Sequence, residues 1–332
     1  MTRNPLVTVP RGVLWLALAA CLLLAGQNPA RGASAADAAA PTVRMAYLQN
    51  DLHHLALWVA LDNGYFDAEG VRVAIAGIFR SGPALMTAFG AGELDAAYVG
   101  EAPATIAAAR GTADIKVLAQ ANTEGSALVG SKALAAGTVA RPTLAMPGNG
   151  TVQDFLLRVA LPKLGLKPEA ADVMVLSPPE MLTALQTGQI DGFIAWEPYP
   201  SRAVAQGIGQ TLAPSAAIWP GHPCCVLVAG TEFIQKHPSE SRALLRAHRK
   251  ATAFIHDHPD AAVAVAVKYT GMDEAVVRLA LGHVTYTETP SLDGEEEYVN
   301  FLHSLGVIKV ADAKAFTRRF IATSVREAAD AK

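Results

Sequence analysis

The sequence predicts an α/β protein of two similar lobes behind an export signal. Three observations support this prediction. Of the 332 residues, 51% are hydrophobic and 17% are charged, which is enough apolar surface for one large core or two ordinary ones. A short apolar run lies near the N-terminus. The rest of the chain alternates apolar strands with helical segments of roughly 10–14 residues in two cycles, a pattern typical of parallel sheets with right-handed crossovers.

The composition also excludes several classes of protein. A disordered chain would contain fewer apolar residues and more charge. The 30 acidic residues exceed the 27 basic ones, so we expect no nucleic-acid partner. Three cysteines are too few for a small scaffold held together by disulfides.

The N-terminus has the features of a secretory signal peptide. Arg3 and Arg11 precede an uninterrupted apolar run of 13 residues, Val13–Ala25. This run is too short to cross about 30 Å of hydrocarbon as a helix. Ala33-Ser34-Ala35 then offers an A-x-A cleavage site. We therefore expect residues 1–35 to be removed on export and the mature protein to be periplasmic.

Two neighbouring features concern how the mature protein begins. Residues 36–41 are mostly small and predict a flexible leader. Leu18-Ala19-Ala20 before Cys21 resembles a lipobox. In this alternative, the protein would be a lipoprotein anchored through an acylated Cys21.

The first cycle begins at Thr42. Short apolar runs bounded by polar residues predict strands, and longer segments predict helices. Asn63-Gly64 is a helix-end signal, and Ser81-Gly82-Pro83 is a helix start with proline in the first turn. In chain order, we expect strands at 43–48, 71–76, 95–99, 115–121 and 127–131, and helices at 53–66, 81–91 and 102–110.

The second cycle begins after Gly137 and follows the same logic. From Thr231 onward the chain is predicted to be helical, with breaks at Pro238, Pro259 and Gly271. Within the cycle, we expect strands at 143–147, 171–176, 191–196 and 225–230, and helices at 152–164, 179–187 and 198–205.

The loops after the strands are the places to look for a site. In open α/β sheets, ligands lie beyond the carboxyl ends of the strands, where helix N-termini favour polar or anionic groups. Several of these side chains also have a purely structural interpretation, because Ser81, Asn149 and Thr151 can cap helices. The residues in such loops are Asn50, Asp51, His53, His54, Arg80, Ser81, Gly100, Glu101, Asn149, Thr151, Ser177, Glu197 and Tyr199.

The segment Gly221-His222-Pro223-Cys224-Cys225 is unusual. Its adjacent cysteines could be buried thiols, a vicinal disulfide or ligands of a soft metal together with His53, His54 or His222. Neither C-x₂-C nor H-E-x-x-H spacing occurs. The chain also lacks G-x-S-x-G, G-x-G-x-x-G and Walker motifs, so we expect neither an enzyme nor a cofactor.

Several phrases give the sequence a family resemblance. They are Asn63-Gly64-Tyr65-Phe66 with Glu69-Gly70-Val71, Ala91-Gly92-Glu93-Leu94-Asp95 with Gly100 and Pro103 following, LQTGQIDGFIAWEP (185–198) and VLVAGTEFIQKHP (226–238). In their order and spacing, the chain resembles the periplasmic substrate-binding proteins of ABC importers of the nitrate/sulfonate/taurine class.

The resemblance implies a type II-like periplasmic binding protein fold, in which two doubly wound lobes are joined by two crossing segments. By position, lobe I would comprise 42–130 plus 226–332 with the C-terminal helices, and lobe II would comprise 131–225. The implied function is capture of a small organic acid, sulfonate or oxyanion by lobe closure. A monomer would then deliver this solute to an ABC permease in the inner membrane.

The resemblance also implies ligand contacts in the cleft. Arg80 and the helix N-termini suit an anion, whereas Glu101, Glu124 and Glu197 would oppose one. The expected contacts are Asn50, His53, Ser81, Gly100, Glu101, Asn149, Thr151, Trp196 and Glu197.

Two alternatives to this reading remain open. One is a protein that binds a soft metal or metal complex through His53, His54, His222, Cys224 and Cys225. The other is an enzyme similar to the pyrimidine-precursor synthase of the same fold family.

Overall fold

The computed structural model describes residues 41–166 and 170–331. The predicted signal peptide and the lipobox at Cys21 lie outside these residues, as does the predicted leader except for its last residue. Within the described ranges, no helix combines the length and apolar character needed to span a membrane.

The first lobe is built on a six-stranded sheet in the order β11-β4-β10-β3-β1-β2. β1 lies parallel to β2 and β3, whereas β10 runs antiparallel to β3 and β4, and β11 antiparallel to β4. The strands are β1 (Thr42–Leu48), β2 (Arg72–Phe79), β3 (Ala96–Gly100), β4 (Ile115–Glu124), β10 (Pro223–Gly230) and β11 (Val284–Tyr286).

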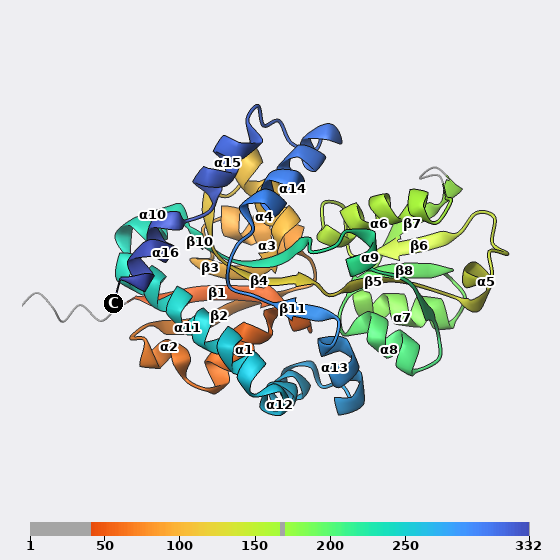
Figure 1. Cartoon of the computed structure of the whole chain (residues 1–332), viewed down its shortest axis with the longest axis horizontal. Helices are drawn as coiled ribbons and strands as arrows, with labels where there is room; N and C mark the ends of the chain where they lie inside the picture. Colours follow the sequence, from red (N-terminus) through yellow and green to blue (C-terminus); the bar gives the residue numbers. More distant parts are fainter. Residues whose placement is uncertain (1–40, 167–169, 332) are drawn as a thin grey trace, which may run out of the picture. The chain divides into compact units, whose positions relative to one another are not determined.

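Helices cover both faces of this sheet (Figure 1). One group packs around α1 and α11, and the other around α3 and α4. The first group and its neighbours are η1 (Leu52–His54), α1 (Leu55–Asp62), α2 (Tyr65–Ala68), α10 (Thr231–Lys236), α11 (Pro238–Asp257), α12 (Pro259–Thr270), α13 (Glu274–Leu281) and α16 (Thr323–Asp330). The second is α3 (Gly82–Gly90), α4 (Glu101–Arg110), α14 (Leu292–Ser304) and α15 (Ala313–Phe320).

The second lobe is built on a five-stranded sheet in the order β7-β6-β8-β5-β9. Figure 1 shows α6 and α9 on one side of it and α7 and α8 on the other. The strands are β5 (Ser126–Gly130), β6 (Thr143–Met146), β7 (Asp172–Val175), β8 (Gly192–Trp196) and β9 (Gln210–Pro214). The helices are α5 (Lys132–Ala135), α6 (Val152–Lys163), α7 (Pro178–Gln186), α8 (Tyr199–Ala205) and α9 (Ser215–Ile218).

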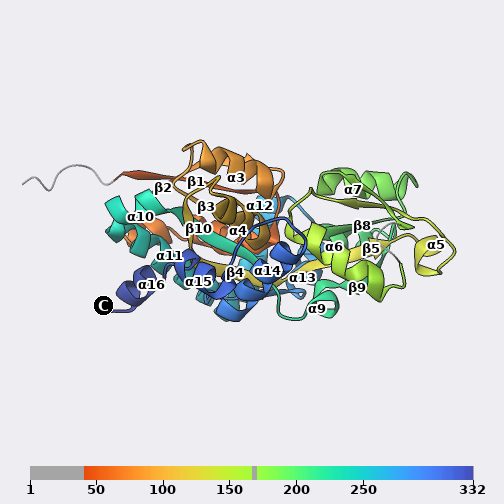
Figure 2. The ribbon, with the colours of Figure 1, turned by 90° about the horizontal axis from the view of Figure 1, so that it is seen from above.

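The chain passes between the two sheets twice, from β4 to β5 and from α9 to β10; Figure 2 shows the β4–β5 passage from above. The first passage occurs at Gly125, which has a φ of +84°. A Cβ atom there would lie 2.3 Å from His53 Nε2, so the position requires glycine. The strand 126–130 therefore belongs to the second sheet, although the expected boundary placed it in lobe I. Likewise, Pro223–Cys225 belong to the first sheet and not to lobe II.

The predicted alternation of strands and helices is confirmed, with differences in detail. The helix expected at 53–66 is divided into η1, α1 and α2, and the break between α1 and α2 occurs where Gly64 takes a left-handed φ of +64°. The sequence analysis did not predict the short strands β9 and β11. β9 is half exposed and lacks a strong apolar run, and β11 has three residues.

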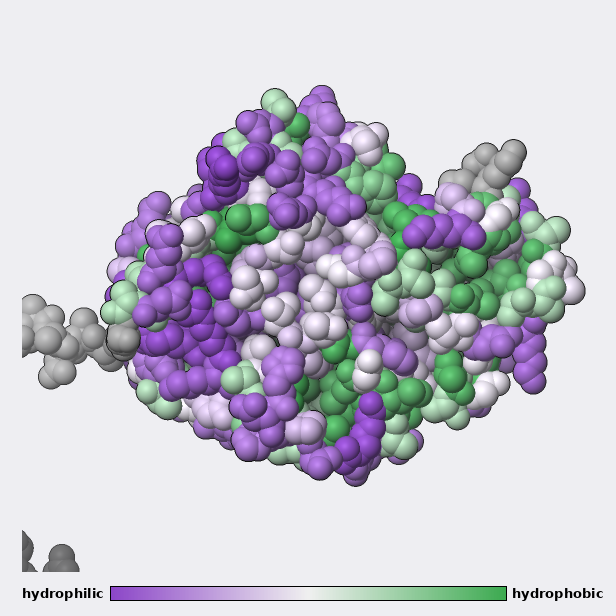
Figure 3. Space-filling model, in the orientation of Figure 1, coloured by the Kyte–Doolittle hydropathy of each residue, from purple (hydrophilic) through white to green (hydrophobic). Residues whose placement is uncertain are grey.

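One face of the first lobe is markedly polar. In Figure 3, hydrophilic residues gather over α11 and α16, and hydrophobic residues are more frequent toward the second sheet. Arg249 pairs with Glu288 and Asp330, and Arg326 pairs with Glu288. These ion pairs fasten the C-terminal helix to the first lobe and lie outside the region where the two lobes meet.

Candidate functional site

A small cavity lies where the two lobes meet, with a volume of about 10 Å³. A space of this size accommodates about one water molecule. Both lobes line it, at the carboxyl ends of β1, β3 and β8, as expected for an α/β sheet. Its first-lobe residues are Leu48, Asp51, Gly82, Gly100, Pro103 and Cys225, and its second-lobe residues are Thr151, Val152, Gln153 and Trp196.

Three helices begin at this cavity. Gly82 opens α3, Gly100 is the N-cap of α4, and Thr151 is the N-cap of α6. The N–H groups and dipoles of these first turns favour an anionic group at the cavity. A Cβ atom on Gly82 would lie 2.4 Å from Pro103 Cγ, so glycine permits α3 and α4 to approach at this point.

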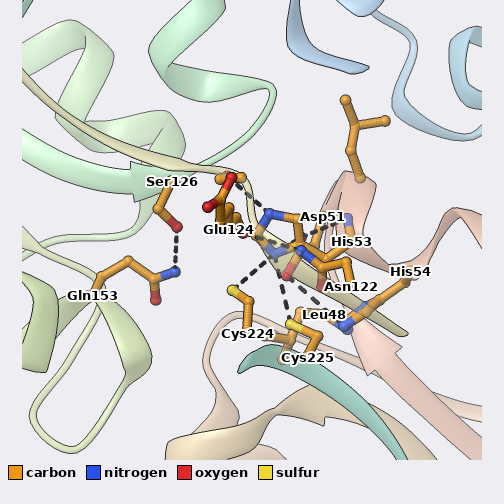
Figure 4. Close-up of polar contacts among 12 residues, drawn as sticks. Leu48, Asp51, His53, His54, Asn122, Glu124, Ser126, Gln153, Cys224 and Cys225 are labelled. Carbon is orange, nitrogen blue, oxygen red and sulfur yellow. Dashed lines mark hydrogen bonds and ion pairs between the residues drawn. The ribbon is translucent and has the colours of Figure 1, made fainter. Parts of the chain in front are cut away.

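The second-lobe wall is neutral. Gln153 Nε2 donates to Ser126 Oγ at 3.0 Å (Figure 4), and Thr151 Oγ1 accepts from Asp154 N at 3.2 Å. Trp196 is 2% exposed, and its indole Nε1 has no acceptor among the described residues. A buried N–H group without a partner is costly, so Trp196, which lines the cavity, carries a donor that is free to bind another group.

The first-lobe wall carries a cluster of buried ionisable groups (Figure 4). His53 Nδ1 lies 3.5 Å from Cys224 Sγ and 3.6 Å from Cys225 Sγ. The same nitrogen is 3.2 Å from Asp51 Oδ1, and His53 Nε2 donates to the Gly125 carbonyl at 2.8 Å. Both thiols are free. Asp51 also caps its own turn by accepting from His53 N at 3.0 Å.

Electrostatic interactions shift the pKa values of this cluster. Burial alone lowers the pKa of His53, but the negative charges of Cys224 and Asp51 raise it to about 10. Burial raises the pKa of the Cys224 thiol, yet its hydrogen bond with Cys225 and the charge of His53 hold the pKa well below its usual value. Burial raises the pKa of Asp51 to about 7. The arrangement therefore favours a thiolate at Cys224 beside a positively charged His53.

Two buried carboxyl groups lie behind the same wall. Glu101 Oε2 accepts from Gln120 Nε2 at 2.8 Å, and Glu295 Oε1 accepts from Thr105 Oγ1 at 2.8 Å. Burial raises the pKa of Glu101 to about 7. Burial and the charge of Glu101 also raise the pKa of Glu295 well above its usual value. Because two adjacent buried carboxylates repel each other, the pair holds a proton between them.

Glu197 connects the two lobes. Its Oε1 atom lies 2.7 Å from His283 Nδ1 of the first lobe. Its Oε2 atom accepts from Ser201 N at 3.1 Å, and its carbonyl accepts from Leu52 N at 3.1 Å. The hydrogen bond that His283 donates to Glu197 raises the pKa of His283. Glu197 therefore holds the lobes together and does not line the cavity.

The nine predicted contacts occupy different environments. Gly100, Thr151 and Trp196 line the cavity. His53, Glu101 and Glu197 lie buried behind its walls. Their side chains already interact with the partners described above. Asn50 and Ser81 are half-buried, and Asn149 is exposed. Asn149 faces a larger groove of about 630 Å³ between α3, α4 and α6.

The alternative metal ligands form two overlapping groups, His53 with Cys224 and Cys225, and His54 with Asp51 and Cys225, and His222 belongs to neither. His53, Cys224 and Cys225 come together, with their donor atoms within 4.8 Å of one another. His54 Nδ1 instead accepts from Leu48 N at 3.2 Å. His222 Nδ1 interacts with the Trp219 carbonyl at 2.8 Å.

The sequence analysis missed several polar residues of the site. Gln153 follows the cap of α6, and a search of first helical turns could have found it. Gln120, His283 and Glu295 carry no local signal. They reach the site only through the packing of β4, α13 and α14, which the sequence alone does not reveal.

Comparison with curated proteins finds relatives linked to nitrate import. The chain is 37% identical over 116 residues to a nitrate import ATP-binding protein, NrtC, of Synechocystis, a match that covers 35% of this chain and 17% of that protein. It is 33% identical over 124 residues to the nitrate/nitrite binding protein NrtA of Synechococcus elongatus, covering 37% and 28% respectively. The chain thus matches less than a third of the length of either relative.

The fold and the family follow from two further comparisons. The periplasmic nitrate-binding protein NrtA from Synechocystis superposes with a TM-score of 0.79 over 87% of this chain and 88% of that chain, at 15% identity. This likeness confirms the predicted periplasmic binding protein fold. The profile of the NMT1-like family matches residues 36–269. Because this match covers well over half of the sequence, the chain belongs to the NMT1-like family.

Proposed function

We propose that this protein is the solute-binding component of an ABC importer and that it captures a small organic acid, sulfonate or oxyanion between its lobes. The observation that carries the proposal is that three helix N-termini meet at one cavity lined by both lobes, where the lining residue Trp196 has a buried N–H group without a partner among the described residues. Such donors suit an anionic group. The names of the relatives, which refer to nitrate, support the same class of solute.

Binding requires the lobes to move. A cavity of about 10 Å³ is too small for a solute of several heavy atoms. The lobes would therefore separate at the two connecting passages, admit the solute and close around it. The contacts of Glu197 with His283 and Leu52 are interactions that opening would break.

A thermal-shift screen of the mature protein tests this function. The panel is nitrate, bicarbonate, taurine, alkanesulfonates and aromatic acids, with amino acids and pyrimidines as other classes. A solute at 100 times its dissociation constant adds about 2.7 kcal/mol of stability. Stabilisation by a member of the anionic group is the expected result. Stabilisation by none of the anions would contradict the proposed class of solute.

A pair of tryptophan variants tests the site with the solute that the screen identifies. Trp196→Phe removes the N–H donor and keeps an aromatic ring. Trp58→Phe makes the same change at a buried tryptophan that does not line the cavity. We expect Trp196→Phe to weaken binding roughly 10- to 100-fold, the effect of losing a hydrogen bond to a charged group. Equal affinities for the two variants would show that the solute binds elsewhere.

We further propose that the protein is located in the periplasm and delivers the solute to a permease. A deletion strain should lose uptake of the identified solute and regain it with the wild-type gene but not with Trp196→Phe. We expect a monomer that starts near residue 36 in periplasmic extracts, which intact-mass measurement can check. A mass that starts at an acylated Cys21 would instead establish the lipoprotein alternative.

A further inference from the structure

We propose that His53, Cys224 and Cys225 form a binding site for one thiophilic metal ion, with Zn²⁺ and Cu⁺ as the probes. The site lies on the first-lobe wall of the cavity, because Cys225 is among the residues that line it. This inference does not depend on the proposed solute or on transport.

The distances between the donor atoms fit a metal ion. Tetrahedral Zn²⁺, with Zn–N of about 2.0 Å and Zn–S of about 2.3 Å, places a nitrogen and a sulfur ligand about 3.5 Å apart. His53 Nδ1 lies 3.5 Å from Cys224 Sγ and 3.6 Å from Cys225 Sγ. His53 Nδ1 therefore already lies at ligand spacing from both sulfur atoms, and all three donor atoms lie within 4.8 Å of one another.

A β-bulge explains how neighbouring cysteines can point the same way. In a regular strand, successive side chains face opposite sides of the sheet. The pairing of β10 with β4 shifts register between Pro223 and Cys225 and again between Cys225 and Val226, so Cys224 has no partner in this ladder. Such a bulge redirects a side chain. Both thiols consequently face His53 (Figure 4).

The backbone fixes the orientation of the imidazole ring. His53 Nε2 donates to the Gly125 carbonyl at 2.8 Å, which leaves Nδ1 directed at the sulfur atoms. Metal-binding histidines commonly donate their second ring N–H group to a carbonyl in this way. The absence of a side chain at Gly125 allows the contact, since a Cβ atom would lie 2.3 Å from Nε2.

His222 neighbours the three donors but stands outside the group that they form. Its Nδ1 atom is held by the Trp219 carbonyl at 2.8 Å. Its buried Nε2 atom has no hydrogen-bond partner among the described residues, and the ring interacts with the Cys224 thiol. Two thiolates and one imidazole form a ligand set that selects Zn²⁺ or Cu⁺ over hard cations such as Mg²⁺.

Metal titration of the mature, tag-free and fully reduced protein tests the site. Zn²⁺ affinity is measured by competition with a chromophoric chelator, and Cu⁺ affinity with a Cu⁺-specific chelator under anaerobic conditions. We expect one equivalent to bind. Cys224→Ser and Cys225→Ser should each weaken binding by at least about 100-fold, since changes to outer-shell partners alone cost 10–100-fold. His53→Ala should have a similar effect, whereas His303→Ala, an exposed histidine, should have none.

Co²⁺ substitution provides a direct readout of thiolate ligation, and circular dichroism controls for the folding of the variants. Co²⁺ bound to the wild-type protein should show thiolate-to-metal charge-transfer absorption that excess Zn²⁺ removes. Loss of this absorption in Cys225→Ser, with an unchanged circular dichroism spectrum, would support the site. Binding of neither Zn²⁺ nor Cu⁺ by the reduced wild-type protein would overturn the proposal. Metal binding without thiolate absorption, or undiminished in both cysteine variants, would also overturn it.

Discussion

The two walls of the interlobe cavity differ in chemistry. The first-lobe wall is backed by buried ionisable groups, among them Asp51, His53 and Glu101. The second-lobe wall presents neutral groups, the side chains of Thr151, Gln153 and Trp196. Changes on the first wall unpair buried charges and should therefore affect stability and its pH dependence. Changes on the second wall remove neutral donors, so their main effect should be on solute affinity.

The largest effect is expected at the junction behind the first wall. In Gly125→Ala, the new Cβ atom would lie 2.3 Å from His53 Nε2 and 2.9 Å from Val284 Cγ2, at a φ of +84°. We expect a loss of roughly 2–5 kcal/mol in the free energy of unfolding, from left-handed strain and overpacking together. Chemical denaturation of the wild type and the variant would measure this loss in the free energy of unfolding.

Gly137→Ala is the matched control for this change. Gly137 also has a positive φ, of +68°, but a Cβ atom there would meet nothing within 4 Å. We expect it to cost only about 1–2 kcal/mol. Equal losses in the two variants would show that the crowding around His53 does not matter.

The second-largest expected effect is a dependence of stability on pH, which arises from the buried carboxyl groups behind the first-lobe wall. Because the pKa of Glu101 is raised to about 7 in the folded protein, the protonated form is favoured by folding. The stability that protonated Glu101 contributes is fully present below about pH 4.5 and is lost as the pH rises through about 7. Glu295→Gln removes a second carboxyl group, whose own pKa is raised by burial and by the charge of Glu101 and whose ionisation also costs stability as the pH rises. We expect the variant to lose less stability than the wild type between pH 5 and pH 8.

Denaturation at several pH values checks this prediction. Glu297→Gln removes an exposed carboxylate from the same helix and should follow the wild-type pH profile. The difference between the two variants should be of the order of 1–3 kcal/mol at pH 8. If Glu295→Gln also follows the wild-type profile, the two carboxyl groups do not share a proton.

The smallest effect on stability is expected at the second wall. Thr151 caps α6 at the cavity, and Ser291 caps α14 away from it by accepting from Gly294 N at 3.0 Å. Thr151→Ala and Ser291→Ala should each cost about 1 kcal/mol of stability. Only Thr151→Ala should also weaken solute binding, because it disturbs a helix start at the cavity. Calorimetric titration of both variants would reveal equal affinities if the second wall makes no contact with solute.

The sequence predicted the fold well because its signals are local. Apolar strands, the helix start at Ser81-Gly82-Pro83 and the helix end at Asn63-Gly64 each depend on a few neighbouring residues. The rule for strand ends also selected Gly100 and Thr151, and the family resemblance added Trp196; the structure places all three at the cavity. The strand-end rule did not distinguish a residue that lines the cavity from one, such as Glu101, that is buried behind the cavity wall.

The remaining part of the site depends on contacts between distant segments. Glu295 reaches Thr105 across 190 positions, and Cys224 reaches His53 across 171. Alternation within a strand would also have placed Cys224 and Cys225 on opposite faces. The bulge that brings them together appears only in the pairing of β10 with β4.

Small-angle X-ray scattering tests the central claim, closure of the two lobes around a solute, most directly. The mature protein is measured without solute and with the anion that stabilises it in the thermal-shift screen, nitrate being the first probe. The account predicts a smaller radius of gyration with the anion for the wild type and Trp58→Phe. It predicts no change for Trp196→Phe at the same anion concentration. A stabilising anion that leaves the radius of gyration of the wild type unchanged would contradict capture by lobe closure.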